Sequence, residues 1–203
     1  MALQTSKTLG GIGALLMVIS PFLISGFTLV LGLVGLILVL IAIKGLSDHY
    51  SESSIFNNSL YGVIISIIGG VVFIAAIIIT ALSFLSDLGI DFYTDWSDPT
   101  AFSSINWTEG VILDTVMAHV GALIGSLVVL FIFAIVAAIF YRKSLTTLSE
   151  KSRVGLFGTT GLLLLIGAVL TIIAIGFLLI WIALILLTIS FFQIKEEPAQ
   201  MTS

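Results

Sequence analysis

Hydrophobic and polar positions are separated along this chain into long blocks instead of alternating residue by residue. Four apolar blocks cover about residues 9–46, 60–86, 111–141 and 154–194. Each block is longer than the ~20 apolar residues that a helix needs to cross a bilayer. The pattern therefore predicts a bundle of membrane-spanning α-helices.

The first and last blocks are too long for a single crossing. A helix of about 40 residues would measure ~60 Å at 1.5 Å per residue, whereas the hydrocarbon core of a bilayer is ~30 Å thick. Each of these blocks is therefore expected to fold back as a hairpin. Pro21 and Gly26 mark the first turn in SPFLISG (20–26), and Gly176 marks the second in IIAIG (172–176), because proline disfavours helix continuation and glycine tolerates a tight turn.

The predicted fold class is all-α integral membrane, with six transmembrane helices arranged as three hairpins in a single membrane domain, residues 1–203. The expected spans are 7–24, 27–46, 60–86, 111–141, 154–172 and 176–194. An outer loop is expected at 87–110, and inner loops at 47–59 and 142–153. The first span is expected to be a retained helix and not a cleaved signal peptide, because the apolar pattern continues beyond Pro21.

Composition agrees with this class. Hydrophobic residues make up 59% of the chain and charged residues only 9%, against about 25% charged residues in a soluble domain. The chain contains no cysteine, which excludes disulfides, thiolate metal sites and cysteine nucleophiles.

The distribution of charge predicts an orientation. With six spans, every basic residue falls on one side of the membrane; these are Lys7, Lys44, Arg142, Lys143, Lys151, Arg153 and Lys195. The stretch from Asp87 to Asp114 has six acidic residues and no basic one. Cytoplasmic segments are enriched in lysine and arginine. Both termini are therefore expected in the cytoplasm, and loop 87–110 outside the cell.

The two outer hairpins resemble each other in sequence. GALLMVI (13–19) is similar to GLLLLIG (161–167), and GFTLVLGL (26–33) is similar to GFLLIWIA (176–183). Because both hairpins would run inside–outside–inside, a repeat of the first and last hairpin would be parallel. Leucine-rich hairpins also resemble one another by composition, so duplication and chance are both open explanations.

Small residues recur at helical spacing within three spans. Such residues allow two helix backbones to approach closely. The face of 111–141 contains Asp114, Ala118, Gly121 and Gly125; that of 60–86 contains Ser66, Gly70, Ile77, Thr80 and Asp87; and 27–46 offers Gly32, Gly35 and Ala42. We expect packing between the protein's own helices at Gly121, Gly125, Gly32, Gly35 and Gly70, with homodimerisation as the other use.

The span 111–141 also holds the candidate intramembrane polar site, which comprises Asp114, His119 and Ser126. Ionisable groups inside a span are costly and are candidate functional residues. Asp114 and His119 are five positions apart, about 140° around a helix, so they are not expected to pair. The alternatives are an interfacial Asp114 favoured by a helix N-terminus and a His119 hydrogen-bonded to a neighbouring helix.

Motifs for catalysis and cofactors are missing. His49 and His119 are expected near opposite sides of the membrane, so one chain cannot clamp a haem between them. No H-E-x-x-H, G-x-S-x-G or Walker sequence is present. We expect no catalytic residue, no metal, no cofactor and no nucleic-acid partner.

The outer loop offers two weaker features. Asp91, Asp95 and Asp98 lack the ligand pattern of an EF-hand, and are expected to be solvated acids with weak divalent-cation binding. Asn106-Trp107-Thr108 is an N-glycosylation sequon. Asn106 and Glu109 resemble a helix-capping box equally well, so both uses of Asn106 are open.

Four stretches carry a family resemblance: GLVGLILVLIAIKGLSDHY (32–50), SIFNNSLYG (54–62), YRKSLTTLSEKS (141–152) and the final hairpin, 161–192. With these stretches the chain resembles an archaeal family of small multi-pass membrane proteins known only as a domain of unknown function. The resemblance implies a helical fold in an archaeal plasma membrane. It implies no activity and no catalytic residues.

Two classes of function fit the sequence. The first is a non-enzymatic structural or accessory subunit that contacts membrane lipids and associates with itself or with a larger membrane complex. The alternative is a small-solute or ion transporter or channel with an outward-facing polar cavity lined by Asp114, His119 and Ser126. The first class predicts a dry core and an exposed packing face, whereas the second predicts a wet cavity.

Overall fold

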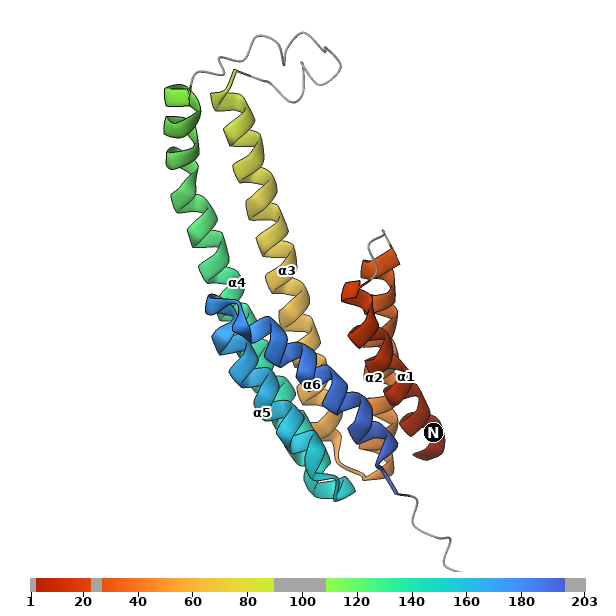
Figure 1. The fold of residues 1–203 in the computed structure, drawn as a ribbon. Helices are drawn as coiled ribbons and strands as arrows, with labels where there is room; N and C mark the ends of the chain where they lie inside the picture. The colour runs from red at the N-terminus through yellow and green to blue at the C-terminus, as the bar shows by residue number, and fades with distance from the viewer. Residues whose placement is uncertain (1–2, 23–26, 90–108, 196–203) are drawn as a thin grey trace, which may run out of the picture. The chain divides into compact units, whose positions relative to one another are not determined.

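A computed structural model describes residues 3–22, 27–89 and 109–195 of the chain. Within these ranges all regular secondary structure is helical, which confirms the predicted all-α class (Figure 1). The elements are α1 (Leu3–Ile19), η1 (Ser20–Phe22), α2 (Phe27–His49), α3 (Ser53–Asp87), α4 (Glu109–Ser152), α5 (Gly155–Leu170), η3 (Thr171–Ile173) and α6 (Ile175–Phe192). Most of the predicted outer loop, with Asp91, Asp95, Asp98 and Asn106, lies outside the described residues.

Five helical stretches of the described chain are long and apolar enough to cross a membrane. They are Val30–His49, Ser53–Asp87, Leu113–Ser152, Gly155–Ile173 and Ile175–Phe192. Helix α1 is apolar as well but has 17 residues, fewer than the ~20 of a typical crossing. A sixth crossing by α1 therefore stays a prediction.

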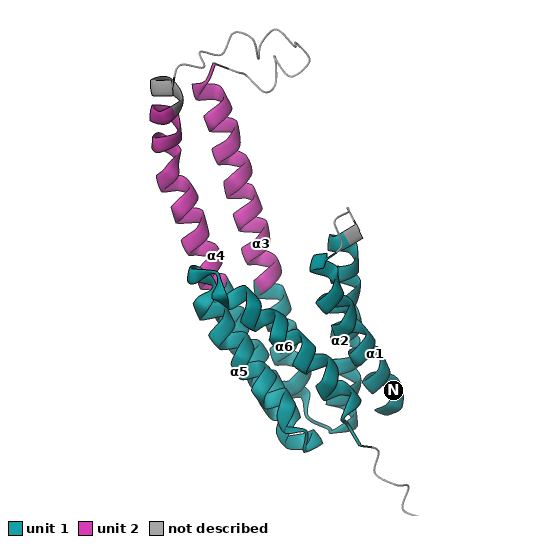
Figure 2. Cartoon of the chain, in the orientation of Figure 1, with its two compact units in different colours: residues 1–65, 134–203 teal, residues 66–133 magenta. Residues whose placement is uncertain are grey.

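The chain divides into two compact units. Unit 1 comprises residues 1–65 and 134–203, and unit 2 comprises residues 66–133 (Figure 2). Helices α3 and α4 each contribute one part to both units. All seven lysines and arginines belong to unit 1 by their position in the sequence. Residues 66–133 contain aspartate and glutamate but no lysine or arginine.

Both predicted helix breaks coincide with short 3₁₀ turns. Helix α1 gives way at Ser20–Phe22, and α5 gives way at Thr171–Ile173. In the second turn Ala174, and not a glycine, takes the left-handed conformation, with φ of 62°. Gly176 is needed for space, because a Cβ there would clash with the backbone oxygen of Gly167. The glycine thus provides space between α5 and α6 and leaves the positive φ to Ala174.

The segments expected as inner loops are largely helical. Helix α2 continues to His49 and α3 begins at Ser53, so only residues 50–52 of the range 47–59 lie outside a helix. Helix α4 continues to Ser152. The polar side chains near the end of α4 do not interrupt the helix, because they bond to carbonyls of the helix itself. Thr147 Oγ1 donates to the Lys143 carbonyl at 3.1 Å, and Ser152 Oγ donates to the Leu148 carbonyl at 2.7 Å.

Close backbone contacts hold α1 against α2 in unit 1. A Cβ on Gly35 would lie 2.6 Å from the Gly13 carbonyl oxygen, and a Cβ on Gly13 would lie 2.7 Å from that of Gly35. Gly161, which aligns with Gly13 in the proposed repeat, instead packs on Arg142 and Leu145 of α4. The two aligned glycines therefore have unrelated neighbours, and the parallel repeat gains no support from these contacts.

Helix α6 packs along α1 and closes the core of unit 1. The Phe191 ring lies on Gly10 and meets Phe157 of α5 edge to face, with 5.3 Å between ring centroids. Further along the two helices, Trp181 Nε1 donates a hydrogen bond of 3.1 Å to the Val18 carbonyl. The fully buried members of this core include Ala14, Ala42, Leu46, Ile55, Leu148, Phe157 and Phe191.

Gly35→Ala is expected to destabilise unit 1, because the added methyl group must push the α1 and α2 backbones apart. Overpacking of this kind costs about 1–3 kcal/mol, which outweighs the gain of about 1 kcal/mol in helix propensity. Gly32→Ala is the matched control in the same helix, since its nearest neighbour, Ser20 Oγ, would lie 3.5 Å from the new Cβ. Thermal unfolding of both variants in detergent measures the difference. Equal melting temperatures would contradict the close crossing.

Candidate functional site

In unit 2, His119 of α4 lies beside Asp87 at the end of α3. His119 Nε2 is 3.6 Å from Asp87 Oδ2, and His119 Nδ1 is 2.9 Å from the Thr115 carbonyl oxygen. Phe84 meets the imidazole edge to face, at 5.7 Å between ring centroids. The His119 side chain is 13% exposed, while that of Asp87 is 57% exposed. We refer to Asp87 and His119 as the polar pair.

The geometry ties this pairing to the protonation state of His119. A carbonyl oxygen can only accept, so Nδ1 must carry the proton that is donated to Thr115. In the neutral ring Nε2 then carries a lone pair and no proton. An Nε2 lone pair does not attract the Asp87 carboxylate. A protonated ring instead presents a second N–H and a positive charge to Asp87. The polar pair is therefore attractive only when His119 is charged.

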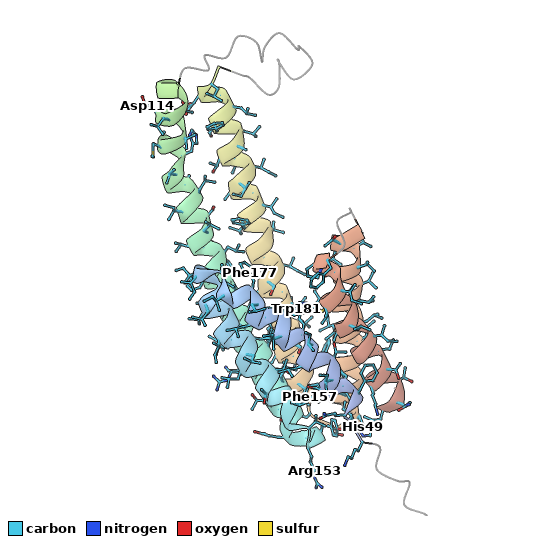
Figure 3. The ribbon with its side chains drawn as sticks, in the orientation of Figure 1. His49, Asp114, Arg153, Phe157, Phe177 and Trp181 are labelled. Atoms are coloured by element: carbon cyan, nitrogen blue, oxygen red, sulfur yellow. The ribbon has the colours of Figure 1, made fainter. Side chains whose placement is uncertain are left out.

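The structure does not bring Asp114, His119 and Ser126 together. Asp114 is exposed near the start of α4 (Figure 3) and forms no ion pair with any described residue. Ser126 is 7% exposed and donates its hydroxyl to the Leu123 carbonyl at 2.8 Å. In the described part of the chain the polar partners of the His119 ring are Asp87 and Thr115, and Asp114 is not among them. The sequence predicts Asp87 on a face of the preceding span but gives no link between Asp87 and His119.

A small cavity of about 330 Å³ lies between α3 and α4 in unit 2. Thr80 and Ser126 contribute the only hydroxyls to its wall, which is otherwise formed by Gly125 and by apolar residues including Val72 and Val129. The Thr80 hydroxyl bonds to the Ala76 carbonyl at 2.8 Å, as Ser126 does to Leu123. Both hydroxyls are therefore satisfied within their own helices, and the His119 ring is not part of the wall.

The predicted packing glycines fall into two groups. Gly35 lies at the α1–α2 crossing, and Gly32 has ordinary contact with Ser20. By contrast, no described atom lies within 4 Å of the position that a Cβ would take at Gly70, Gly121 or Gly125. Within unit 2 the close approach occurs instead at Gly69, where a Cβ would lie 2.6 Å from Cβ of Phe133.

A buried serine pair joins α3 and α4 in unit 1. Ser144 Oγ donates to the Ile55 carbonyl at 2.6 Å, so the 2.7 Å contact between Ser59 and Ser144 is a hydrogen bond donated by Ser59. Ser144 is fully buried and Ser59 is 2% exposed. The sequence does not predict this pair, because polar composition assigns both residues to loops. Helical spacing is the sequence signal that could have placed Ser59 in a helix, since Ile55, Ser59 and Gly62 follow one another at four and three positions.

Two turns in unit 1 are built in the same way. The Ser47 hydroxyl bonds to the Glu52 carbonyl at 2.8 Å across Ser51, and the Ser149 hydroxyl bonds to the Val154 carbonyl at 3.1 Å across Arg153. Ser51 and Arg153 are both left-handed, with φ of 52° and 57°. The turns therefore connect α2 to α3 and α4 to α5 by the same serine-closed geometry.

An ion pair links the two turns. Lys151 Nζ is 3.3 Å from Glu52 Oε2, and the Ser54 hydroxyl donates to Glu52 Oε1 at 2.8 Å. The hydrogen bond from Ser54, followed by the interaction with Lys151, holds the pKa of Glu52 below its ordinary value of 4.5. Beside the α4–α5 turn lies a cavity of about 1220 Å³, which we call the basic pocket; its wall includes Leu3, His49, Lys151, Arg153, Gly155 and Lys195.

Comparison with known proteins assigns the chain to a family. The sequence profile of DUF996, a family described as proteins of unknown function, matches residues 31–185. The chain belongs to the DUF996 family. Uncharacterized protein MJ1644 from the archaeon Methanocaldococcus jannaschii is similar, with 30% identity over 197 residues that cover 97% of this chain and 96% of the relative. No solved structure matches the chain.

The DUF996 match covers most of the features described above. It begins within α2 and ends within α6, so it includes both serine-closed turns, the Ser59–Ser144 bond and the polar pair. It leaves out α1 and Lys195. The family description supplies no activity, and among the described residues no group of three or more His, Asp or Glu side chains is arranged to hold a metal.

Glu52 gives the DUF996 protein a pH-dependent contribution to stability. A carboxyl with a lowered pKa in the folded state stabilises the protein above its unfolded pKa, and this contribution is lost as the pH falls through the folded pKa. We therefore expect the melting temperature to decrease below about pH 4.5, and we expect Glu52→Gln to weaken that decrease. Melting curves from neutral pH to about pH 3 measure the effect.

Glu150→Gln serves as the control for this comparison. Glu150 is an exposed neighbour of Lys151 and forms no ion pair with a described residue. Its removal should leave the shape of the pH profile unchanged. Identical profiles for the wild type and Glu52→Gln would contradict the role assigned to the Glu52–Lys151 contact.

Proposed function

We propose that the protein is a non-enzymatic, multi-pass membrane protein that acts as a structural or accessory subunit. It associates with itself or with a larger membrane complex. The contact surface is the face of α4 that contains Ala118, Gly121 and Gly125, which we call the small-residue face.

The proposal places six helices across an archaeal plasma membrane, with both termini in the cytoplasm and residues 87–110 outside the cell. Five described stretches have the length and composition for crossing. Basic residues from the α2–α3 side, the α4–α5 turn and the C-terminal segment meet at one end of unit 1, where His49, Lys151, Arg153 and Lys195 line one pocket. Such clustering of lysine and arginine is typical of cytoplasmic ends.

The open surroundings of Gly121 and Gly125 are the observation that carries the proposal. The two glycines lie four positions apart on α4, and apart from the neighbouring backbone of α4 itself no described atom lies within 4 Å of where a Cβ would be. In a bilayer, helix association depends on close van der Waals packing, which small residues at i and i+4 permit. A face of small residues without close neighbours fits another transmembrane helix better than it fits lipid chains, and at Gly125 this face borders the cavity between α3 and α4.

The polar residues of α3 and α4 in unit 2 support a dry interior. Thr80 and Ser126 bond to carbonyls of their own helices, so neither hydroxyl is directed to a solute. Residues that line the cavity between these helices are otherwise apolar or glycine. A path for ions or polar solutes needs groups that replace their hydration, and among the side chains of this cavity's described residues only the two hydroxyl oxygens could do so.

The double variant Gly121→Leu/Gly125→Leu is expected to weaken association by about tenfold or more, because two large side chains block close helix approach. Native mass spectrometry of protein released from its own membrane in mild detergent measures the associated fraction. Ala75→Leu is the control, since Ala75 is an exposed small residue of α3 outside the small-residue face. Unchanged association of the double variant, or a wild type recovered only as a bare monomer, would overturn the proposal.

The polar pair is the one observation that favours a transporter as the second candidate. A histidine whose attraction to Asp87 depends on its proton could couple proton uptake to another event. The accessory proposal predicts that purified protein in liposomes gives no proton-coupled flux above protein-free liposomes. Flux that is present in the wild type and lost in His119→Ala, or reduced in Asp114→Asn, would instead establish the transporter.

A further inference from the structure

The basic pocket combines four separate parts of unit 1. Leu3 belongs to the start of α1, His49 to the end of α2, and Lys195 to the segment after α6. The fourth part is the continuous stretch from Lys151 at the end of α4, through Arg153 in the turn, to Gly155 at the start of α5. His49 and Arg153 lie at the same end of unit 1 (Figure 3). With a volume of about 1220 Å³, the pocket is somewhat larger than a typical small-molecule site of about 300–1,000 Å³.

The wall of the pocket is positively charged. Lys151, Arg153 and Lys195 line it together with His49, and no described aspartate or glutamate does. Lys151 shares its charge with Glu52, whose Oε2 lies 3.3 Å away. Arg153 has no ion pair with any described residue, so its guanidinium is available to a ligand.

Local hydrogen bonds fix the backbone positions of the residues that carry these charges. The left-handed Arg153, with φ of 57°, sits in a turn closed by the Ser149 hydroxyl and by a 3.3 Å hydrogen bond from Val154 N to Ser152 Oγ. Lys7 Nζ donates to the Ile194 carbonyl at 3.0 Å and so holds the segment that carries Lys195. The pocket is therefore a built feature of unit 1 and not a chance grouping of surface side chains.

The first turn of α5 adds donors to the same wall. Gly155 and Leu156 line the pocket, and the N-terminus of α5 has no side-chain cap. The first backbone N–H groups of a helix lack intrahelical partners, and such termini attract anions. At Gly155 a Cβ would meet no atom within 4 Å, so a ligand can approach this backbone closely.

We propose that the basic pocket binds a phosphate-bearing anion. Arg153 and Lys151 hold the phosphate oxygens, which accept charge-assisted hydrogen bonds from guanidinium and ammonium groups, while the uncapped N–H groups of α5 complete the site. The phosphate can belong to an anionic lipid headgroup or to a soluble phosphate compound. This site is independent of the small-residue face.

The test uses the full-length protein reconstituted in two kinds of nanodisc, one of phosphatidylcholine alone and one with added phosphatidylglycerol. Native mass spectrometry counts retained phosphatidylglycerol, and melting temperatures in phosphatidylcholine nanodiscs are followed during titration with inorganic pyrophosphate at constant ionic strength. Lys151→Gln/Arg153→Gln removes two charges from the pocket. Arg142→Gln/Lys143→Gln removes the same two residue types from the nearby surface of α4 outside the pocket.

We expect the pocket double variant to bind the anion roughly 10- to 30-fold more weakly, the effect of two cationic contacts, and we expect the surface double variant to bind as the wild type does. Retained phosphatidylglycerol without a response to pyrophosphate assigns the site to a lipid headgroup. Stabilisation by pyrophosphate assigns it to a soluble phosphate compound. Failure of the wild type to respond to either probe, or equal losses in both double variants, would overturn the proposal.

Arg153→Gln alone keeps the test interpretable if the double variant folds poorly. Arg153 is exposed and lacks an ion pair in the described part of the chain, so its replacement leaves the Glu52–Lys151 contact in place. This single variant should still bind the anion several-fold more weakly than the wild type, with an unchanged melting temperature in the absence of anion. Wild-type affinity in this variant would contradict the proposal.

Discussion

Close approach of helix backbones at glycines is the constraint on which unit 1 depends. Gly13 and Gly35 bring α1 and α2 together, and Gly167 and Gly176 do the same for α5 and α6. Lipid chains are as apolar as leucine, so burial of leucine alone gives little preference for one helix contact over another. Shape complementarity at these crossings provides that preference. The Phe191 ring on Gly10 and the Trp181 bond to Val18 then attach the last hairpin to the first.

Much of the fold follows from the sequence because apolar block length and helix-breaking residues are local properties. The four blocks, the turn after Ile19 and the turn after Leu170 required no knowledge of distant residues. The ends of the helices required more. Polar composition at 47–59 and 142–153 indicated loops. Yet the hydroxyls of Thr147 and Ser152 bond back to carbonyls of their own helix, and each segment contains a buried apolar side chain, Ile55 in the first and Leu148 in the second.

The candidate site residues were likewise predictable only where they depend on one helix. The five-residue spacing of Asp114 and His119 on α4 sets the angle between them, because angular position around one helix is fixed by the sequence. The partner of His119 is on α3, and the depth at which α3 and α4 face each other cannot be read from either helix alone. The Ser59–Ser144 bond and the basic pocket are likewise formed by segments far apart in the chain. Membership of DUF996 adds an archaeal relative and no chemistry.

The hydrogen bond from Lys7 to the Ile194 carbonyl couples two segments that are far apart in the chain. Lys7 belongs to α1, and Ile194 belongs to the short segment that follows α6. Their neighbours Leu3 and Lys195 line the same cavity. A change that displaces the start of α1 therefore also releases the segment after α6, and with it one wall residue of the basic pocket.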